Sequence, residues 1–248
     1  MPKLAVMTWN VLWTEKADNV LDLISMVAPD ILCCQELTTD SYYNPKRNMP
    51  KEIAELLNAD YEYREGLTVR DRETAYKVTF GNAIFSKFPI GSRRYVRLRN
   101  DKLSADELQK RVYVEIGLDV QGQSLTVGTT HLSYVPYFKM TPMRFKEAEN
   151  LYKAVGKPSS RFIFTGDMNA SPDSAIVRTL AKRFKNVGPD TKQKTWTTKH
   201  HSDGDFKVNG LEWRLDYIFV TPDIKVISSQ ILDTKYSDHL PIVAELDT

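Results

Sequence analysis

The sequence predicts an α+β protein in which two packed β-sheets are flanked by helices. Expected strands outnumber expected helices, many strands follow one another directly, and short apolar runs such as residues 31–34 and 162–164 are typical of buried strands. The 248 residues, with 42% hydrophobic content, suffice for one large domain with a sizeable core. We therefore expect a single domain over residues 1–248.

The expected elements follow from apolar periodicity and from turn signals. Strands are predicted at 4–11, 31–36, 61–65, 82–86, 91–98, 112–120, 124–131, 161–165, 215–220, 224–232 and 242–246. Helices are predicted at 17–27, 50–57, 141–155 and 173–184, with Thr141-Pro142 as a helix start and Gly156 as its end. Residues 38–49, 133–140 and 195–210 lack periodicity and are expected to be loops that contact a substrate.

The two cysteines, Cys33 and Cys34, are adjacent in one apolar run. Neighbouring strand residues point to opposite faces and a vicinal disulfide is strained, so we expect two buried free thiols, typical of a reducing compartment. No apolar run approaches the roughly 20 residues of a membrane span, and the start of the chain leads into a strand rather than a cleavable signal. The expectation is a cytoplasmic protein that acts as a monomer, without a membrane or an obligate protein partner.

The net charge of +2 is nearly balanced, but two segments are strongly basic. The basic residues of 87–102 are Lys87, Arg93, Arg94, Arg97, Arg99 and Lys102, and those of 178–199 are Arg178, Lys182, Arg183, Lys185, Lys192, Lys194 and Lys199. Two interpretations stand: the segments hold a polyanion by neutralising its phosphates, or they are ordinary solvated surface. On the first, Arg94 and Arg97 contact the substrate.

Short polar motifs end apolar runs along the whole chain. They are Thr8-Trp9-Asn10, Gln35-Glu36, Thr130-His131-Leu132, Gly166-Asp167-Met168-Asn169, Leu215-Asp216-Tyr217 and Ser237-Asp238-His239. Polar side chains at strand ends can converge in one cleft although they are far apart in sequence. Carboxylates and carboxamides suit Mg²⁺, and a histidine with an aspartate suits proton transfer or charge stabilisation. The motifs therefore indicate metal-assisted hydrolysis of a phosphoester.

Taken together and in this order, the motifs resemble the exonuclease–endonuclease–phosphatase superfamily, from Thr8 to Ile242. Residues 81–90 also resemble the central strand and turn of that family. The resemblance implies a four-layer α/β/β/α sandwich, and it implies hydrolysis of phosphodiesters with Mg²⁺, for which Mn²⁺ can substitute. Nucleic acid is the favoured substrate, acted on by a nuclease or a DNA-end phosphodiesterase. The alternative is an inositol phosphate or a phospholipid headgroup.

The resemblance assigns three residues to the metal. Glu36 matches the direct ligand, Asn10 lies near the metal and holds Glu36 or bound water, and Asp238 lies on the metal side. Without the other motifs, Glu36 would be a solvated strand-end acid and Asn10 a turn residue.

Five residues are assigned to catalysis. Asp167 orients or deprotonates the attacking water, and Asn169 donates to a phosphate oxygen; the structural alternative for this pair is an Asx turn. By resemblance, Asp216 hydrogen-bonds His239, which stabilises the phosphorane or protonates the leaving oxygen. His131 matches a second histidine that contacts the scissile phosphate.

Several residues depart from the pattern or stay open. Leu12 stands where apurinic endonucleases and tyrosyl-DNA phosphodiesterase have an acid, which favours a deadenylase-like or generic bacterial member. Tyr134 and Tyr137 form a stacking platform for a base or close the end of the sandwich. Trp196 is assigned to a loop that contacts substrate, and Arg144 to an ion pair within its own helix.

Overall fold

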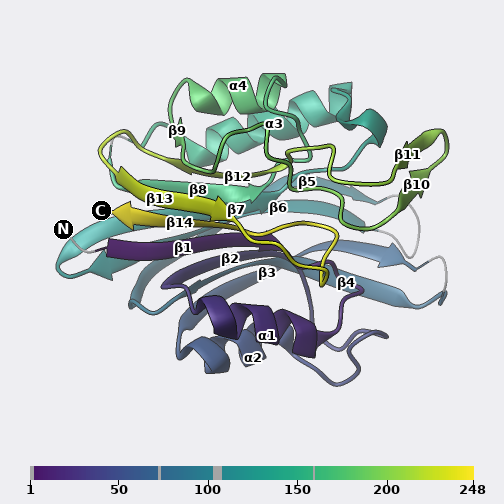
Figure 1. Cartoon of the computed structure of the whole chain (residues 1–248), viewed down its shortest axis with the longest axis horizontal. Coiled ribbons are helices and arrows are strands. Elements are labelled where there is room, and N and C mark those ends of the chain that lie inside the picture. Colours follow the sequence, from purple (N-terminus) through teal and green to yellow (C-terminus); the bar gives the residue numbers. More distant parts are fainter. Residues whose placement is uncertain (1–2, 72–73, 103–107, 159) are drawn as a thin grey trace.

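The computed structural model describes the chain except residues 1–2, 72–73, 103–107 and 159. Two β-sheets lie face to face between two layers of helices, as Figure 1 shows. The helices are α1 (Ala17–Val27), α2 (Met49–Leu57), α3 (Pro142–Val155) and α4 (Ala175–Ala181), with the short 3₁₀ helix η1 (Pro136–Phe138). α1 and α2 cover one sheet, and α3 and α4 cover the other. The predicted four-layer α/β/β/α sandwich is thereby confirmed.

The first sheet has the strand order β13-β14-β1-β2-β4-β3. Its strands are β1 (Lys3–Asn10), β2 (Ile31–Thr38), β3 (Asp60–Arg70), β4 (Lys77–Ser86), β13 (Lys225–Ile231) and β14 (Ile242–Asp247). β1 and β2 are parallel, so both run towards the same edge of the sheet. That edge receives Asn10 and Glu36.

The second sheet has the order β6-β7-β8-β12-β9, with β5 pairing on the free side of β6. Its strands are β5 (Ile90–Lys102), β6 (Leu108–Val120), β7 (Gln123–His131), β8 (Phe162–Asp167), β9 (Lys185–Asn186) and β12 (Asp216–Val220). β7 and β8 are parallel and bring His131 opposite Asp167. The two sheets are joined at one side, where Leu67 and Thr68 of β3 pair with β6.

Three apolar layers hold the sandwich together. Aliphatic side chains fill the space between the sheets, and two further clusters pack α1 and α2 on one sheet and α3 and α4 on the other. Cys33 lies in the central layer and Cys34 in the layer under α1 and α2, both free and fully buried. The prediction of two buried thiols on opposite faces of a strand is confirmed.

The helix boundaries follow their capping residues. Thr141 caps α3 by accepting from the N–H of Arg144 at 3.3 Å, and Gly156 follows the last helical residue, as predicted. α4 is shorter than the predicted 173–184, because Ser174 is its N-cap and the chain leaves the helix after Ala181. Among the described helices none is long and apolar enough to cross a membrane.

The segment 195–210 was predicted as a loop, and this was wrong in part. It contains the hairpin of β10 (His201–Asp203) and β11 (Phe206–Val208), which stands out from the sandwich. The strands are too short to show periodicity, and they form because Phe206 and Val208 pack with Trp196 in a separate aromatic cluster. The hairpin forms one side of the site.

Candidate active site

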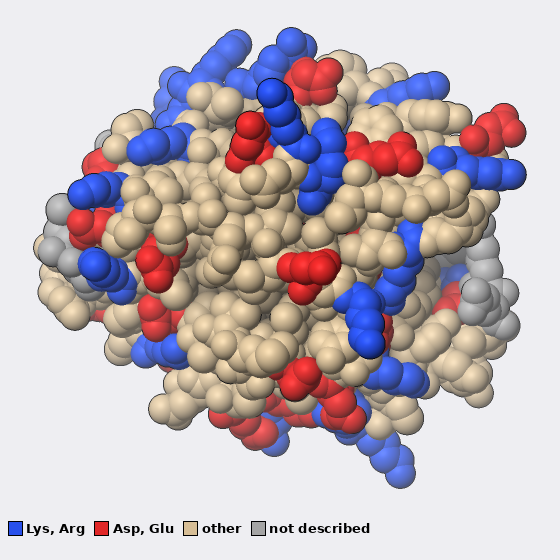
Figure 2. Space-filling model, viewed as in Figure 1, with Lys and Arg blue, Asp and Glu red and all other residues tan. Residues whose placement is uncertain are grey.

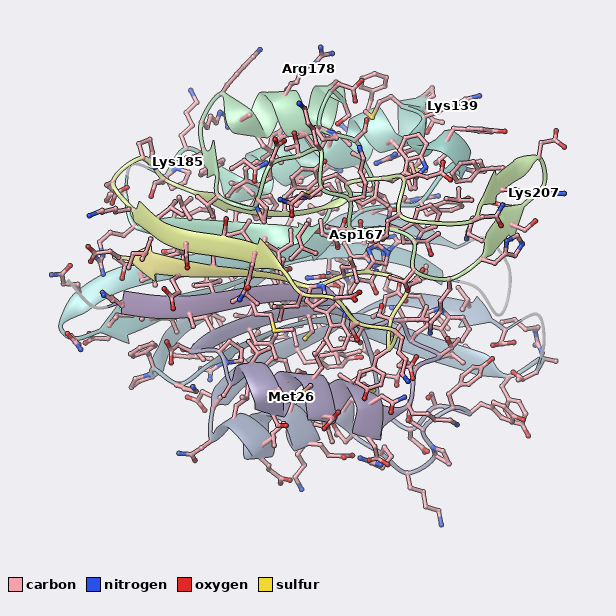
Figure 3. All side chains as sticks on the ribbon, in the orientation of Figure 1. Met26, Lys139, Asp167, Arg178, Lys185 and Lys207 are labelled. Carbon is pink, nitrogen blue, oxygen red and sulfur yellow. The ribbon has the colours of Figure 1, made fainter. Side chains whose placement is uncertain are left out.

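A pocket of about 300 Å³ opens where the ends of β1, β2, β7 and β8 meet. Its polar side holds residues of the predicted motifs, and Asp167 lies near the centre of the molecule between the two sheets (Figure 3). The polar lining residues are Glu36, Arg111, His131, Asp167, Asn169, His201, Asp238 and His239, and the apolar ones include Leu12, Trp13, Leu67, Val69 and Phe80. Strand ends far apart in the sequence therefore converge, as expected.

A β-bulge turns Glu36 into this pocket. The register between β2 and β4 shifts between Cys34 and Leu37, and Glu36 has a φ of +65°. Its two carboxylate oxygens accept from the Asn10 side-chain amide and from the backbone N–H of Trp13, each at 3.1 Å. The bulge and the positive φ together direct the side chain away from the face that a regular strand would give it.

The surroundings of Glu36 fit a divalent cation. Burial, and after it the charge of Asp238, raise the pKa of Glu36. Two hard oxygen donors of like charge beside a pocket are what Mg²⁺ or Ca²⁺ requires, and each oxygen keeps a lone pair beyond its present hydrogen bond. Asn10 supports this site: its side-chain amide donates to Glu36, and its carbonyl oxygen accepts from the N–H of Leu12 at 3.1 Å.

A second group also offers ligand atoms close together: Asp167, Asp216 and His239, within 4.8 Å of one another. We assign these three to proton handling instead. His239 Nδ1 and Asp216 Oδ2 already bond each other at 2.9 Å, and a metal ion there would have to break that contact. The Glu36–Asp238 side needs no such rearrangement.

Asp167 is held from several sides at the end of β8. Its Oδ2 accepts from Asn10 at 3.1 Å, and its Oδ1 accepts from the N–H of Asn169 at 2.8 Å. Gly166, at a φ of +138°, brings the strand so close to β7 that an added Cβ would lie 2.0 Å from the carbonyl oxygen of Thr130. Burial raises the pKa of Asp167 to about 7, with His239 opposing and Asp216 adding to the shift. A carboxylate in this range can exchange a proton near neutral pH.

His239 is fixed between three carboxylates. Its Nδ1 contacts Asp216, and its Nε2 lies 3.6 Å from Asp167 Oδ2. Burial lowers its pKa, but the charges of Asp216, Asp167 and Asp238 prevail and raise the pKa well above its usual range. The backbone is pinned as well, because the carbonyl of His239 accepts from the indole of Trp9 at 3.0 Å. The site thus holds a cationic imidazole beside a buried carboxylate.

His131 is the opposite case. Burial, Arg111 and His239 lower its pKa well below the usual range, so that it is neutral. Its Nε2 lies 3.1 Å from the amide nitrogen of Asn169, which can only donate, so the ring proton is on Nδ1. The same amide donates to the carbonyl of Leu132 at 2.9 Å. Asn169 was predicted to donate to a phosphate oxygen; here its amide hydrogens are engaged, and it positions His131.

A model of the Endonuclease/Exonuclease/phosphatase family matches residues 7–239, from within β1 to His239. The chain belongs to this family. Its members are phosphoester hydrolases, generally dependent on divalent metal ions, so the chain is a phosphoester hydrolase. No curated protein matches the sequence.

Solved structures share the fold at low sequence identity. The endonuclease/exonuclease/phosphatase from Beutenbergia cavernae is 22% identical with a TM-score of 0.79, over 99% of this chain and 72% of that one. The human Nocturnin catalytic domain with a bound sulfate is 20% identical with a TM-score of 0.68, over 99% of this chain and 94% of that one. D. rerio TDP2 in complex with a single-stranded DNA product is 17% identical with a TM-score of 0.70, over the whole of both chains.

Trp196 was predicted to contact substrate, and it lines the pocket, where its side chain also holds Asp238. Its side chain is 3% exposed, and its indole N–H donates to Asp238 Oδ2 at 2.9 Å. This hydrogen bond fixes the Asp238 carboxylate, which lines the same pocket as Glu36. Tyr134 does line the pocket, and its hydroxyl lies 3.0 Å from Nε2 of His201 in the β10–β11 hairpin.

Other predicted contacts lie outside the pocket. Tyr137 donates to the carbonyl of Asp205 and packs on Phe206. Arg94 bonds the Glu115 carboxylate at 2.8 Å, and Arg97 lines a different pocket. The ion pair expected within α3 for Arg144 is wrong: the guanidinium is fully buried and donates to the carbonyls of Phe138 and Met168.

Arg111 is a pocket residue that the motifs did not reveal. It lies on β6 at 6% exposure, and its Nε has no hydrogen-bond partner in the described part of the chain. Burial lowers its pKa, while the charges of Glu147, Glu36 and Asp167 act against that shift. A cation with unused donors, buried at the wall of a phosphoesterase pocket, suits a phosphate oxygen. The only hint in the sequence was that Arg111 is a charged residue at the start of the alternating apolar run that forms β6.

Proposed function

We propose that this protein hydrolyses phosphodiester bonds in nucleic acid and requires Mg²⁺, with Mn²⁺ as a substitute. The observation that supports the chemistry most strongly is the row of Asp216, His239 and Asp167, linked at 2.9 Å and 3.6 Å beside a separate carboxylate pair. One group in this row takes up a proton near neutral pH and another carries a positive charge.

Glu36 and Asp238 would hold the metal, supported by Asn10. When bound there, Mg²⁺ polarises the phosphate and neutralises part of its charge. Asp167 orients a water and accepts its proton, because its carboxylate is buried and its pKa lies near neutrality. The attack is in line with the leaving oxygen.

The remaining groups act on the phosphate. Cationic His239, held by Asp216, stabilises the charge that develops on the phosphorane. Neutral His131 donates from Nδ1, with its orientation fixed by Asn169. Arg111 supplies the unused donors on the β6 side of the pocket. Each of these groups is ordered before substrate arrives, which reduces the cost of reorganisation in the transition state.

The apolar side of the pocket favours a nucleobase over the alternative, an inositol phosphate or a phospholipid headgroup. Trp13 stacks on Phe80 with ring centroids 5.7 Å apart, and Leu67 and Val69 adjoin them. A base has a π-face that suits such a wall, whereas an inositol ring presents hydroxyl groups on all sides. The D. rerio TDP2 complex with a DNA product is consistent with this choice.

A substrate panel tests the proposal. Single- and double-stranded DNA, RNA, a 5′-tyrosyl oligonucleotide, an abasic duplex, sphingomyelin and an inositol phosphate are each incubated with enzyme and Mg²⁺. We expect turnover of at least one nucleic acid, lost with a chelator and restored by Mg²⁺. Asp167→Asn should abolish that turnover while the substrate still binds, because it replaces the basic carboxylate by an amide of nearly the same size that cannot accept the proton. Turnover confined to the lipid or the inositol phosphate, or turnover that resists the chelator, would contradict the proposal.

A further inference from the structure

A second pocket, of about 360 Å³, is lined by residues of β3, β5 and β6. Its lining includes Tyr63, Arg64, Tyr95, Arg97 and Lys110. None of these residues takes part in the proton handling or the metal site described above. A cavity of this volume is within the range of ligand sites.

The basic residues Arg97 and Lys110 in this pocket differ from Arg93 and Arg94 of β5, because they have no carboxylate partner in the described part of the chain. Arg93 pairs with Glu62 at 3.4 Å and Arg94 with Glu115 at 2.8 Å, so these arginines are neutralised locally. In the described part of the chain, neither Arg97 nor Lys110 has a carboxylate partner. Like charges placed together without a counter-ion repel, and an anion bound between them relieves that cost.

Arg64 adds a third cation with a fixed orientation. Its Nε lies 2.6 Å from Glu62 Oε1, and its guanidinium carbon lies 4.5 Å from the centre of the Tyr95 ring. Tyr95 itself is 45% exposed. Arg64 is paired with Glu62, and the single acid in the described lining is Glu65, so the two cations without a carboxylate partner, Arg97 and Lys110, face one carboxylate. The pocket has an excess of positive charge and an exposed aromatic ring at its side.

The position of this basic pocket relative to the catalytic one follows from strand register. Arg97 pairs with Val112 on β6, and the next residue, Tyr113, pairs with Thr130 beside His131. Arg97 and His131 are therefore two strands apart in one row, about 10 Å between their backbones at the usual strand spacing. Both pockets lie at the same end of the strands.

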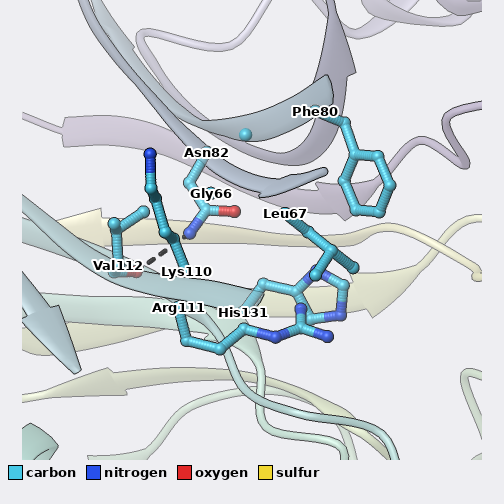
Figure 4. Close-up of a pocket in the computed structure, with 9 residues that line it drawn as sticks. Gly66, Leu67, Phe80, Asn82, Lys110, Arg111, Val112 and His131 are labelled. Carbon is cyan, nitrogen blue, oxygen red and sulfur yellow. Dashed lines mark hydrogen bonds between the residues drawn. The ribbon is translucent and has the colours of Figure 1, made fainter. Parts of the chain in front are cut away.

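A small cavity of about 10 Å³ lies between the two pockets, and Figure 4 shows its lining. Lys110 lines this cavity and the basic pocket, while Arg111 and His131 line this cavity and the catalytic pocket. Such a cavity holds at most one water. A ligand that reaches both pockets must therefore pass outside this small cavity. Lys110 and Arg111 are the cations that line the cavity between the two pockets.

We infer that the basic pocket is a second phosphate site, in which Arg97, Lys110 and Arg64 hold the backbone of a nucleic-acid strand whose scissile phosphate lies in the catalytic pocket. This inference rests on the proposed function. A stacked strand rises about 3.4 Å per nucleotide, so 10 Å corresponds to about three nucleotides. A small phosphoester cannot reach both sites, whereas an oligonucleotide carries further phosphates at regular spacing. Arginine suits the phosphate contact in the basic pocket, because its planar guanidinium can donate two parallel hydrogen bonds to two oxygens of one phosphate.

The test compares binding of a single-stranded 12-mer with hydrolysis of a small chromogenic phosphodiester. Binding is measured by fluorescence anisotropy with a chelator present, so that it does not depend on turnover. For Arg97→Glu/Lys110→Glu we expect at least a 10-fold loss of affinity. The slope of log K against log salt should fall by about 1.4, at about 0.7 for each lost contact with a single strand. The kcat/KM for the small diester should stay within twofold of the wild type.

Two further variants serve as controls. Arg178→Glu/Lys185→Glu makes the same change in net charge far from Asp167, as Figure 3 shows, and should bind the 12-mer as the wild type does. Arg97→Gln/Lys110→Gln removes charge without reversing it and should give a smaller loss. Figure 2 shows acidic and basic side chains mixed over the face in view, with the basic ones more frequent along the upper edge, where Figure 1 places α4.

The outcomes separate this inference from the proposed function. Unchanged 12-mer affinity and salt slope in Arg97→Glu/Lys110→Glu would overturn the inference, as would no measurable binding by the wild type at low salt. An equal loss in the Arg178→Glu/Lys185→Glu control would also overturn it, because net charge alone would then account for the effect. A wild type that binds the 12-mer through this pocket but hydrolyses no nucleic acid would instead contradict the proposed function.

Discussion

His239 Nδ1 lies 2.9 Å from Asp216 Oδ2, although the two residues come from different parts of the fold, the loop between β13 and β14 and the start of β12. Both are buried, and Asp216 Oδ1 has no other partner in the described structure. The contact raises the pKa of His239 against the effect of burial and directs its Nε2 towards Asp167. This pair determines whether the pocket holds a cationic imidazole beside Asp167.

Replacing Asp216 should therefore disable His239. For Asp216→Asn we expect kcat to fall by about 10²–10⁴-fold with little change in KM, because the amide holds the ring without its negative charge. His239→Ala should cost a similar factor. The double variant should be no slower than the slower single variant, since the two residues act as one unit. Steady-state kinetics checks this, and fully additive losses would contradict the coupling.

The role of Glu36 in metal binding should be measurable from the melting temperature of the protein, without an activity assay. Mg²⁺ that binds only the folded wild type should raise its melting temperature in proportion to the logarithm of its concentration. Glu36→Gln should remain folded and lose that rise, since the site keeps its shape but not its charge. Glu55→Gln, at an exposed pair with Lys51, is the matched control and should respond as the wild type does. A rise in both variants would place the metal elsewhere.

Arg111 should matter for every phosphodiester, unlike Arg97 and Lys110. For Arg111→Met we expect kcat/KM to fall by about 10–100-fold on oligonucleotides and on the small diester alike, through loss of a charge-assisted contact. The melting temperature should not fall, because a buried cation without a bonded carboxylate is replaced by an apolar side chain of similar length. Wild-type kinetics with the small diester would exclude Arg111 from phosphate binding. A large loss of stability would assign it to the fold.

Cys33 and Cys34 should be inert in the native protein. Burial raises the pKa of Cys33 to about 12 and that of Cys34 well above its usual range, so neither forms a thiolate at pH 8. Ellman's reagent should detect no thiol in the folded enzyme and two after unfolding in guanidinium. Rapid reaction of either cysteine in the native state would show that the sheet opens locally.

The sequence alone determined the parts of this structure that depend on local patterns. α1 matches its predicted bounds, and the strand cores, the opposed burial of Cys33 and Cys34 and the Thr141 cap follow from periodicity and from capping preferences. The motif residues could be named because each ends an apolar run. Their order along the chain indicated the family, and with it the four layers.

Only the tertiary structure decided how those residues act on one another. Asn10 and Asp167 are 157 positions apart in sequence, and their hydrogen bond exists because two sheets bring their strand ends together. The bulge that turns Glu36 into the pocket, the engagement of the Asn169 amide and the burial of Arg111 depend on neighbouring strands as well. The same holds for β5, where Arg94 is paired and Arg97 is not, because the partner carboxylate comes from β6. Periodicity records which face of a strand is buried, but not which distant side chain it meets there.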